Sequence, residues 1–228
     1  MSGAIFFRNT AHQFYFIIFC FVCFSEPAAA AGKITASEAE VWANQKGRQL
    51  LDTFSEPDVK TKYAKLDEMF LNDVDLEYVG KFVVGKYWRQ MTPEQRERYI
   101  PLFKRYSLSL YKNFPLSFNF KINFKITGVK LDRDYADVTA DISLDGRQQP
   151  GQPAEKFLVG FRIHKVGGKL KIIDLKLAES SLILSYRGRF YEMLRRNDDE
   201  IEWFLEDLEL ITSSAEQQNQ MTLTGQNL

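Results

Sequence analysis

The sequence KIIDLKLAESSLILSYRGRF occupies residues 171–190 and contains the transition that decides the fold. Its first half is rich in isoleucine, leucine and lysine and carries one acidic residue, Asp174. Such a run, bounded by a turn, is typical of a strand. After Ser180 and Ser181 the chain enters a segment headed by Tyr186 and Arg187, which predicts a helix. A strand therefore leads directly into a helix here.

Three segments upstream alternate apolar and polar side chains, as half-buried strands do. They cover residues 116–126, 136–144 and 157–163. Gly167 and Gly168 predict a two-residue hairpin turn before the strand that contains Asp174. Four sequential strands joined in this way predict an antiparallel meander sheet.

Residues 35–114 instead repeat apolar side chains at helical spacing. One helix is expected to present a single face from Leu76 to Tyr87. Another begins at Thr92, where Gln95 can complete a capping box. Two closing helices follow the sheet, and the whole pattern predicts an α+β fold. In it, the four-stranded antiparallel meander sheet is covered by N-terminal helices and closed by C-terminal helices.

The N-terminus has the order of a secretory signal peptide. Arg8 precedes an apolar run at residues 14–24, and alanines follow at 28–31. The run is too short to cross the hydrocarbon core of a bilayer, about 30 Å thick, as a helix. We therefore expect residues 1–31 to be a cleaved signal peptide, residues 32–212 to form one domain, and the polar residues 213–228 to be a disordered tail.

Cleavage would change the composition of the chain. Both cysteines leave, so disulfides contribute nothing, and His164 becomes the last histidine. Arg8 and Glu26 are lost from thirty basic and thirty acidic residues, so the net charge stays zero. A neutral chain is a poor candidate for binding nucleic acid or anionic headgroups by charge alone.

The candidate catalytic motifs are incomplete. Residues 80–87 resemble a phosphate-binding loop, but Tyr87 stands where a serine or threonine would hold Mg²⁺. His164 has no nucleophile motif or cysteine and histidine partners, and is interpreted as a solvent-side strand residue. We expect no catalytic residue, no metal and no cofactor. Aspartates in the strand region are interpreted as solvated charges, although one could act as a pocket base if burial raised its pKa; they are Asp132, Asp134, Asp137 and Asp141.

What remains is an apolar interior with small residues, Ala136 and Ala140, on the same face as large ones. A sheet roofed by helices in this way predicts either a filled core or a ligand cavity, and the sequence leaves both open.

Two blocks carry a family resemblance. Residues 85–96, GKYWRQMTPEQR, continue to Phe103 and Tyr111, and residues 173–190 follow the four strands. Together they resemble the MlaC family of periplasmic phospholipid-binding proteins, also called toluene-tolerance auxiliary proteins. The resemblance implies a cystatin- or NTF2-like fold. It also implies a monomeric carrier that shuttles phospholipid between an inner-membrane ABC transporter and an outer-membrane lipoprotein complex. A hopanoid-binding relative would look similar.

On this basis we expect passive capture of lipid in an apolar cavity. The expected lining residues are Val83, Tyr87, Leu102, Tyr106, Leu110, Phe120, Ile122, Phe124, Val138, Ala140, Ile142, Phe161, Ile163, Leu175, Leu177, Tyr186 and Phe190.

Within this set, Tyr87, Tyr106 and Tyr186 are expected at the cavity mouth with their hydroxyls outward. Arg187 and Arg189 could contact a headgroup phosphate or a partner. For Arg187 we favour an ion pair inside the fold, with Asp174. Together with Ser180, these two residues would join the last strand to the closing helix.

Two other functions stay open. An NTF2-like isomerase or dehydratase would use a pocket Asp–Tyr pair and predicts a buried carboxyl group with a raised pKa. A periplasmic adaptor with a filled core predicts no cavity.

Overall fold

The computed structural model describes residues 33–112, 121–145, 155–177 and 180–223. The helices in these ranges are α1 (Ala36–Phe54), α2 (Val59–Asp73), α3 (Leu76–Val84), α4 (Lys86–Gln90), α5 (Pro93–Tyr111), α6 (Leu182–Arg196) and α7 (Ile201–Leu223). The strands are β1 (Lys121–Asp132), β2 (Tyr135–Asp145), β3 (Glu155–Val166), β4 (Lys169–Leu177) and β5 (Ser180–Ser181). None of the helices in these ranges combines the length and the apolar character that a bilayer crossing requires.

Side-chain caps set where most of the helices begin. In each of five helices, the residue before the first turn accepts a hydrogen bond from the backbone N–H three positions on, which satisfies a donor that the helix itself cannot. The capping residues are Thr35, Asp58, Asp75, Thr92 and Ser181. At α5 the predicted capping box with Gln95 is confirmed.

The sheet is an antiparallel meander in the order β1-β2-β3-β4-β5. The four predicted strands are present, and the short β5 adds a fifth at the edge of β4. Gly167 and Gly168 form the predicted hairpin turn, with φ angles of 56° and 76° that suit glycine. Residues 116–120 of the first predicted strand lie outside the described ranges.

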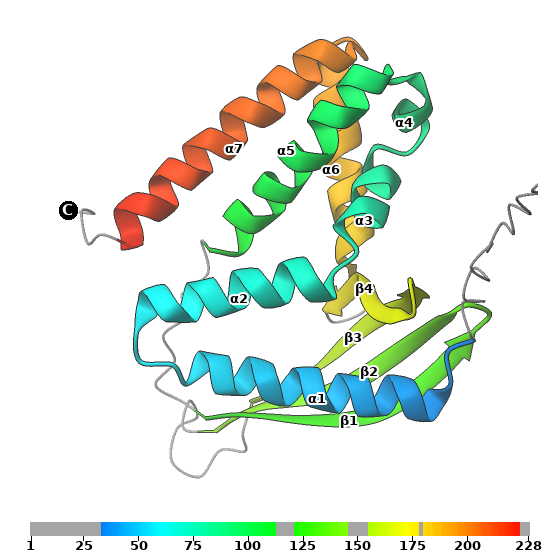
Figure 1. The fold of residues 1–228 in the computed structure, drawn as a ribbon, viewed down its shortest axis with the longest axis vertical. Helices are drawn as coiled ribbons and strands as arrows, with labels where there is room; N and C mark the ends of the chain where they lie inside the picture. Colours follow the sequence, from blue (N-terminus) through cyan, green and yellow to red (C-terminus); the bar gives the residue numbers. More distant parts are fainter. Residues whose placement is uncertain (1–32, 113–120, 146–154, 178–179, 224–228) are drawn as a thin grey trace, which may run out of the picture. The chain divides into compact units, whose positions relative to one another are not determined.

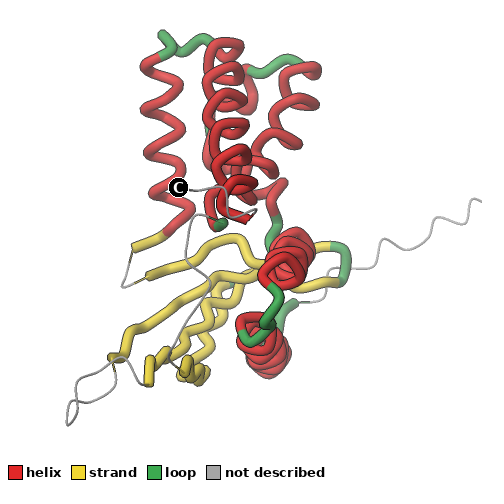
Figure 2. The backbone as a smooth tube through the Cα atoms, turned by 90° about the vertical axis from the view of Figure 1, so that its left-hand side faces the viewer, coloured by secondary structure: helices red, strands yellow, loops and turns green. Residues whose placement is uncertain are grey.

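The helices occupy two places in the fold (Figure 1). α1 and α2 run side by side along one face of the sheet, and Figure 2 shows them nearly end-on beside the strands. α3, α5, α6 and α7 form a bundle beyond the end of the sheet, where β5 continues into α6. The expected covering helices and closing helices are therefore both present.

Each group of helices has its own hydrophobic cluster. The sheet cluster includes Ala39 and Ala43 of α1 with Val138 and Ile163 of the sheet. The bundle cluster draws its buried residues from α3 to α7. The two clusters share no buried residue, so the described part of the chain has two cores instead of one.

The expected disorder of residues 213–228 is wrong for residues 213–223, which form the end of α7. The polar side chains there make specific contacts with α5. Asn219, which is 6% exposed, donates to the carbonyl of Ser109 at 2.8 Å. Arg105 bonds Glu216 at 2.7 Å. The first half of α7 packs through the buried side chains of Phe204, Leu205 and Leu208, whereas its polar end is held by hydrogen bonds and ion pairs, which composition does not reveal. Residues 224–228 lie outside the described ranges.

The single helix expected from Leu76 to Tyr87 is also wrong, because Gly85 divides it. Gly85 has a φ of 54° and ends α3, and α4 begins at the next residue. A Cβ atom at this position would lie 2.4 Å from the Tyr191 hydroxyl oxygen and 2.7 Å from the Arg187 guanidinium. The break therefore needs glycine for its backbone angle and for its neighbours.

We expect Gly85→Ala to lower the free energy of unfolding by about 1–3 kcal/mol, because alanine disfavours this φ and collides with α6. Gly188→Ala is the matched control. Gly188 is exposed inside α6, and a Cβ atom there would meet no neighbouring atom within 4 Å, so alanine should stabilise by about 0.5–1 kcal/mol. Urea unfolding followed by circular dichroism measures both, and equal effects of the two variants would contradict the assignment.

Candidate functional site

The strand register brings the expected sheet residues onto one face, because directly opposed residues of antiparallel strands point to the same side. Phe124 pairs with Ile142, and Val138 pairs with Phe161, which in turn pairs with Leu175. The same face carries the remaining expected sheet residues Ile122, Ala140, Ile163 and Leu177. Phe120 lies outside the described ranges.

Cover over this face is uneven. α1 buries the side near Ala136 and Ile163, both 0% exposed. Toward the start of β3 and the end of β4 the cover is lost, and Phe157 and Leu177 are 39% and 49% exposed. We call the half-buried and exposed part the open apolar face. Its members are Phe124, Ile142, Phe157, Val159, Phe161, Leu175 and Leu177.

α1 borders the open apolar face at very close range. A Cβ atom at Gly47 would lie 2.3 Å from the ring of Phe124, so the helix backbone rests directly on that ring. Gly47, Phe157 and Val159 were not among the expected site residues. The alternation in β3 already placed Phe157 and Val159 on the apolar face, but nothing in the sequence distinguishes Gly47 from other helix glycines.

The expected helical residues lie elsewhere, in the bundle cluster. Its buried members include five of them, which are 0–3% exposed: Val83, Tyr87, Leu102, Tyr106 and Phe190. Leu110 and Tyr186 are partly buried and pack against this cluster. Tyr106 meets Phe190 edge to face at a centroid distance of 5.4 Å. The expected set thus divides between the packed helical core and the sheet face, where Val138, Ala140 and Ile163 are buried and the other described members are half-buried or exposed, and it does not line one space.

The expected tyrosine mouth is wrong for Tyr87 and Tyr106, which are 2% and 3% exposed. Tyr87 donates its hydroxyl to the carboxylate of Asp199. Burial, and then this contact with Asp199, raise the pKa of Tyr87 to about 12. Burial and a hydrogen bond with Tyr135 likewise raise the pKa of Tyr78 to about 12. Both hydroxyls therefore keep their protons at ordinary pH, and that of Tyr87 donates to Asp199.

These pKa values predict the alkaline behaviour of the fold. A tyrosine pKa raised from 10 to about 12 stabilises the folded state fully below pH 10, and the contribution is lost as the pH rises toward 12. Absorbance at 295 nm should show at least three late-ionising tyrosines in the folded protein, because burial also raises the pKa of Tyr99 well above its ordinary value. Tyr87→Phe should remove one of them and reduce the loss of stability over this range. A titration in which every tyrosine ionises near its ordinary pKa would contradict the prediction.

The joint between β4 and α6 is polar. Asp174 accepts hydrogen bonds from the Ser181 hydroxyl at 2.7 Å and from the backbone N–H of Ile183 at 3.0 Å. Ser180, which we expected here, is exposed. The expected role was therefore right for Asp174 and wrong for Ser180, because Ser181 is the residue that caps α6.

Arg187 is held inside the bundle, but not by Asp174. It donates to the carbonyl of Phe82 and to the hydroxyl of Tyr191, both at 3.1 Å. Its guanidinium also lies 4.9 Å from the centroid of the Phe82 ring and 5.1 Å from that of the Tyr191 ring. Arg189 is exposed, with its guanidinium 5.9 Å from the Tyr186 centroid. The expected ion pair of Arg187 is thus replaced by carbonyl, hydroxyl and ring contacts.

His164 is not the solvent-side residue that we expected. Its Nε2 lies 2.8 Å from the Oδ2 of Asp75, and its side chain is 14% exposed. The ring of Tyr78 lies at a centroid distance of 5.2 Å. The connection from α2 to α3 runs along the edge of β4, where the backbone N–H of Asp75 donates to the carbonyl of Ile172 at 2.9 Å. The start of α3 therefore covers this histidine.

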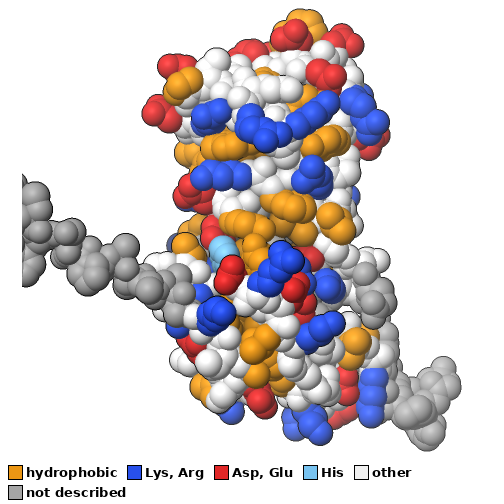
Figure 3. Space-filling view, turned by 90° about the vertical axis from the view of Figure 1, so that its right-hand side faces the viewer, with side chains coloured by type: hydrophobic (Ala, Val, Ile, Leu, Met, Phe, Trp, Pro, Cys, Tyr) orange, Lys and Arg blue, Asp and Glu red, His pale blue; other side chains and the backbone are white. Residues whose placement is uncertain are grey.

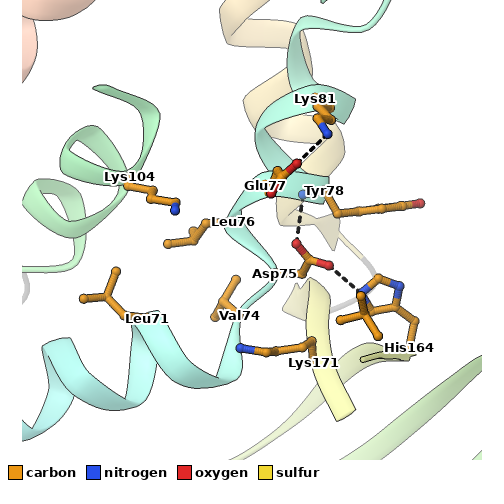
Figure 4. Close-up of a pocket in the computed structure, with 11 residues that line it drawn as sticks. Leu71, Val74, Asp75, Leu76, Glu77, Tyr78, Lys81, Lys104, His164 and Lys171 are labelled. Carbon is orange, nitrogen blue, oxygen red and sulfur yellow. Dashed lines mark hydrogen bonds and ion pairs between the residues drawn. The ribbon is translucent and has the colours of Figure 1, made fainter. Parts of the chain in front are cut away.

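An open pocket of about 600 Å³ adjoins His164 (Figure 4). Its apolar lining is Leu71, Val74, Leu76 and Val166, and its lysines are Lys81, Lys104 and Lys171. Its two carboxylates are already engaged. Asp75 accepts from the backbone N–H of Tyr78 and contacts His164, and Glu77 pairs with Lys81 at 2.6 Å. The pocket offers binding contacts but no free base beside a nucleophile.

The structure also bears on the enzyme alternative, which predicts a carboxyl group with a raised pKa. Asp137 has the opposite shift, because its hydrogen bonds with Arg162, at 2.6 and 2.9 Å, lower its pKa. Among the described residues, each carboxyl pKa that is displaced is displaced downward: Glu38, Glu56, Asp58, Glu94, Asp137 and Glu209. In the same ranges no cluster of three or more His, Cys, Asp and Glu side chains could hold a metal.

The chain is similar to proteins of a known family. A family model described as MlaC protein matches residues 45–209. The toluene tolerance protein ttg2D of Pseudomonas putida is 25% identical over 141 residues, which cover 61% of this chain and 62% of that relative. This chain thus aligns with less than two thirds of the relative's length.

A solved structure extends the similarity to the fold. It is a phospholipid-binding protein from Ralstonia solanacearum, in complex with a phospholipid. The two structures superpose with a TM-score of 0.62 at 16% identity, over 78% of this chain and 98% of that one. At this identity the match speaks for the fold alone, and the α+β fold expected from the sequence is confirmed.

Proposed function

The chain belongs to the MlaC protein family, and from that premise we propose that it is a periplasmic carrier of phospholipid. It would hold acyl chains against the open apolar face and shuttle them between an inner-membrane ABC transporter and an outer-membrane lipoprotein complex. In this role it is a carrier and not an enzyme. The signal peptide expected at residues 1–31 supports the periplasmic location, although those residues lie outside the described ranges.

The observation that carries the proposal is the open apolar face. Phe157 and Leu177 present large apolar side chains at the end of the sheet, and Ile142, Val159 and Phe161 are only half-buried beside them. A row of apolar side chains left without full cover marks a binding surface. Each acyl CH₂ buried there would contribute about 0.8 kcal/mol, so a sixteen-carbon tail gains roughly 12 kcal/mol before the cost of association.

The relatives support the same ligand class. The Ralstonia protein was solved with a phospholipid, and the Pseudomonas relative is named for toluene tolerance. Binding without catalysis also fits the carboxyl groups of the described residues. None of them has a pKa shifted upward, as a general base in a pocket would need. The face itself does not distinguish a two-chain phospholipid from a hopanoid.

Native mass spectrometry of the mature protein, purified from the periplasm without detergent and followed by lipid extraction, tests the proposal. We expect one two-chain phospholipid for each protein. A hopanoid in its place would keep the carrier role and change the ligand. Protein that is free of lipid both on purification and after incubation with phospholipid vesicles would overturn the proposal.

A further inference from the structure

Charges are segregated on the helical bundle although the whole chain is neutral. α7 contains no lysine or arginine. Its glutamates pair with arginines of α5: Arg98 with Glu202, and Arg105 with Glu209 at 2.8 Å. The opposite sign collects around α4. Four cations near α4 have no ion pair to a described carboxylate, and we call their surface the basic face: Lys86, Arg89, Arg96 and Arg195.

Aromatic rings connect these cations into one surface. The Nζ of Lys86 lies 4.8 Å from the Tyr87 centroid, and the guanidinium of Arg96 lies 5.3 Å from the Trp88 centroid. Tyr87 meets the ring of Tyr191 at 5.4 Å, and the carbonyl of Tyr191 accepts from Arg195. Figure 3 shows the side of the molecule that lies on the right in Figure 1. Lys and Arg side chains gather there over the helical part.

Two carboxylates near the basic face are already engaged. Asp199 accepts from the hydroxyl of Tyr87, and Glu77 pairs with Lys81 at 2.6 Å. Neither carboxylate therefore forms an ion pair with the cations of the basic face among the described residues. Charge of one sign left on a surface favours a partner of the other sign.

The geometry favours an acidic protein over a membrane. Arg96 and Arg195 each donate to backbone carbonyls, of Trp88 and Tyr191, at 3.0 Å and 3.3 Å. With a further bond from the Nη2 of Arg96 to the carbonyl of Arg89 at 3.3 Å, these contacts fix the plane of each guanidinium. The remaining Nη donors have no protein partner among the described residues and can pair with carboxylates.

Docking on a bilayer is instead strengthened by apolar side chains that insert. In the described ranges, the exposed large apolar side chains lie outside α3, α4 and α5, and those of α6, Leu182 and Leu184, lie in its first turn next to β5 and not near Arg195 at its last turn.

We propose that the basic face is the docking surface for an acidic segment of a protein that gives lipid to this chain or takes it away. The proposal rests on the carrier function and adds the partner's chemistry and its place on the fold. The basic face belongs to the bundle and the open apolar face belongs to the sheet, so a partner could bind the one without covering the other.

Photo-crosslinking in living cells that carry the gene tests this. The full chain receives benzoylphenylalanine at Gln90, an exposed residue next to Arg89 in α4, so that every cation stays in place. We expect a crosslink to one protein, within a segment rich in Asp and Glu. Lys86→Glu with Arg89→Glu should lower its yield at least about tenfold. Changing the crosslinked carboxylates of the partner to lysine should restore the yield with this double variant.

Arg48→Glu with Lys60→Glu is the matched control, because both residues are exposed on α1 and α2 and the change in net charge is the same. It should leave the crosslink yield within about twofold of the unchanged chain. An equal loss with the control, a crosslink to a segment without acidic residues, or no crosslink to any protein would overturn the proposal.

Two further measurements separate the alternatives. Vesicles of phosphatidylcholine with about one third phosphatidylglycerol should not retain the chain. Salt-sensitive retention that Lys86→Glu with Arg89→Glu abolishes would assign the basic face to a membrane and overturn the proposal. Native mass spectrometry should find the same lipid content in this double variant as in the unchanged chain. Lipid-free unchanged chain would instead refute the carrier function, whatever the crosslinks show.

Discussion

Ile142→Glu should leave the protein folded and remove its lipid. Ile142 is half-buried in the open apolar face, between its strand partners Phe124 and Phe157. An ionised carboxylate there is tolerated while water can reach it. Covering it with an acyl chain costs several kcal/mol. Since 1.4 kcal/mol is tenfold in affinity, the lipid that copurifies should fall at least about tenfold by native mass spectrometry.

Thr139→Glu is the matched control on the same strand. Thr139 points to the opposite face of the sheet and pairs with Gly160, beyond which Lys176 follows on the next strand. A carboxylate at this position faces that lysine across a residue without a side chain, so stability and lipid content should both stay near those of the unchanged chain. Equal lipid content in the two variants would show that the open apolar face is not where the tails bind.

Ending the chain after Thr212 should destabilise it strongly. The deletion removes the hydrogen bond from Asn219 to the carbonyl of Ser109, which is 2% exposed, and the ion pair between Arg105 and Glu216. A buried carbonyl that loses its partner costs about 1–3 kcal/mol. With the lost helix packing, we expect a total of about 4 kcal/mol, which lowers Tm by roughly 8–16 °C for a chain of this size.

Differential scanning calorimetry of the shortened chain measures this, with Gln217→Ala as the control. Gln217 is exposed on the same helix, so its replacement should change Tm by about 1 °C or less. A disordered tail predicts no change on deletion. An unaltered Tm of the shortened chain would therefore contradict the prediction. It would show that the polar end of α7 is a disordered tail, as its composition suggested.

The sequence predicted those elements in which local pattern and tertiary packing agree. Alternation in residues 136–144 placed Val138, Ala140 and Ile142 on one face, and the register confirms it. The cap of α5 at Thr92 was readable because its partner lies only three residues away. In both cases the information is contained in neighbouring residues.

The failures involve contacts that are distant in the chain. Gly85 breaks a helical pattern because Arg187 and Tyr191, about a hundred residues on, occupy the space beside it. Asn219 belongs to a helix because Ser109 accepts its side-chain bond. His164 is covered because Asp75 returns to the edge of the sheet. No local propensity contains these partners.

Only the strand part of the candidate site could be predicted from the sequence, because the rest depends on contacts between residues that are distant in the chain. Strand alternation identifies an apolar face, but which part of that face a helix covers depends on where α1 lies across it. The helical residues of the expected set were apolar and periodic too. Tyr87 and Phe190 nevertheless pack into a second core, which hydrophobicity alone cannot separate from the first.

Several of the contacts between the two cores are hydrogen bonds. Asp174 with Ser181, Asp75 with His164, and the backbone bond from Asp75 to Ile172 all lie along this line. Hydrogen bonds at such a seam can be exchanged for bonds to water at little net cost, whereas separating packed side chains exposes apolar surface. A small shift of the bundle against the sheet should therefore cost less free energy than separating the packed side chains inside either core.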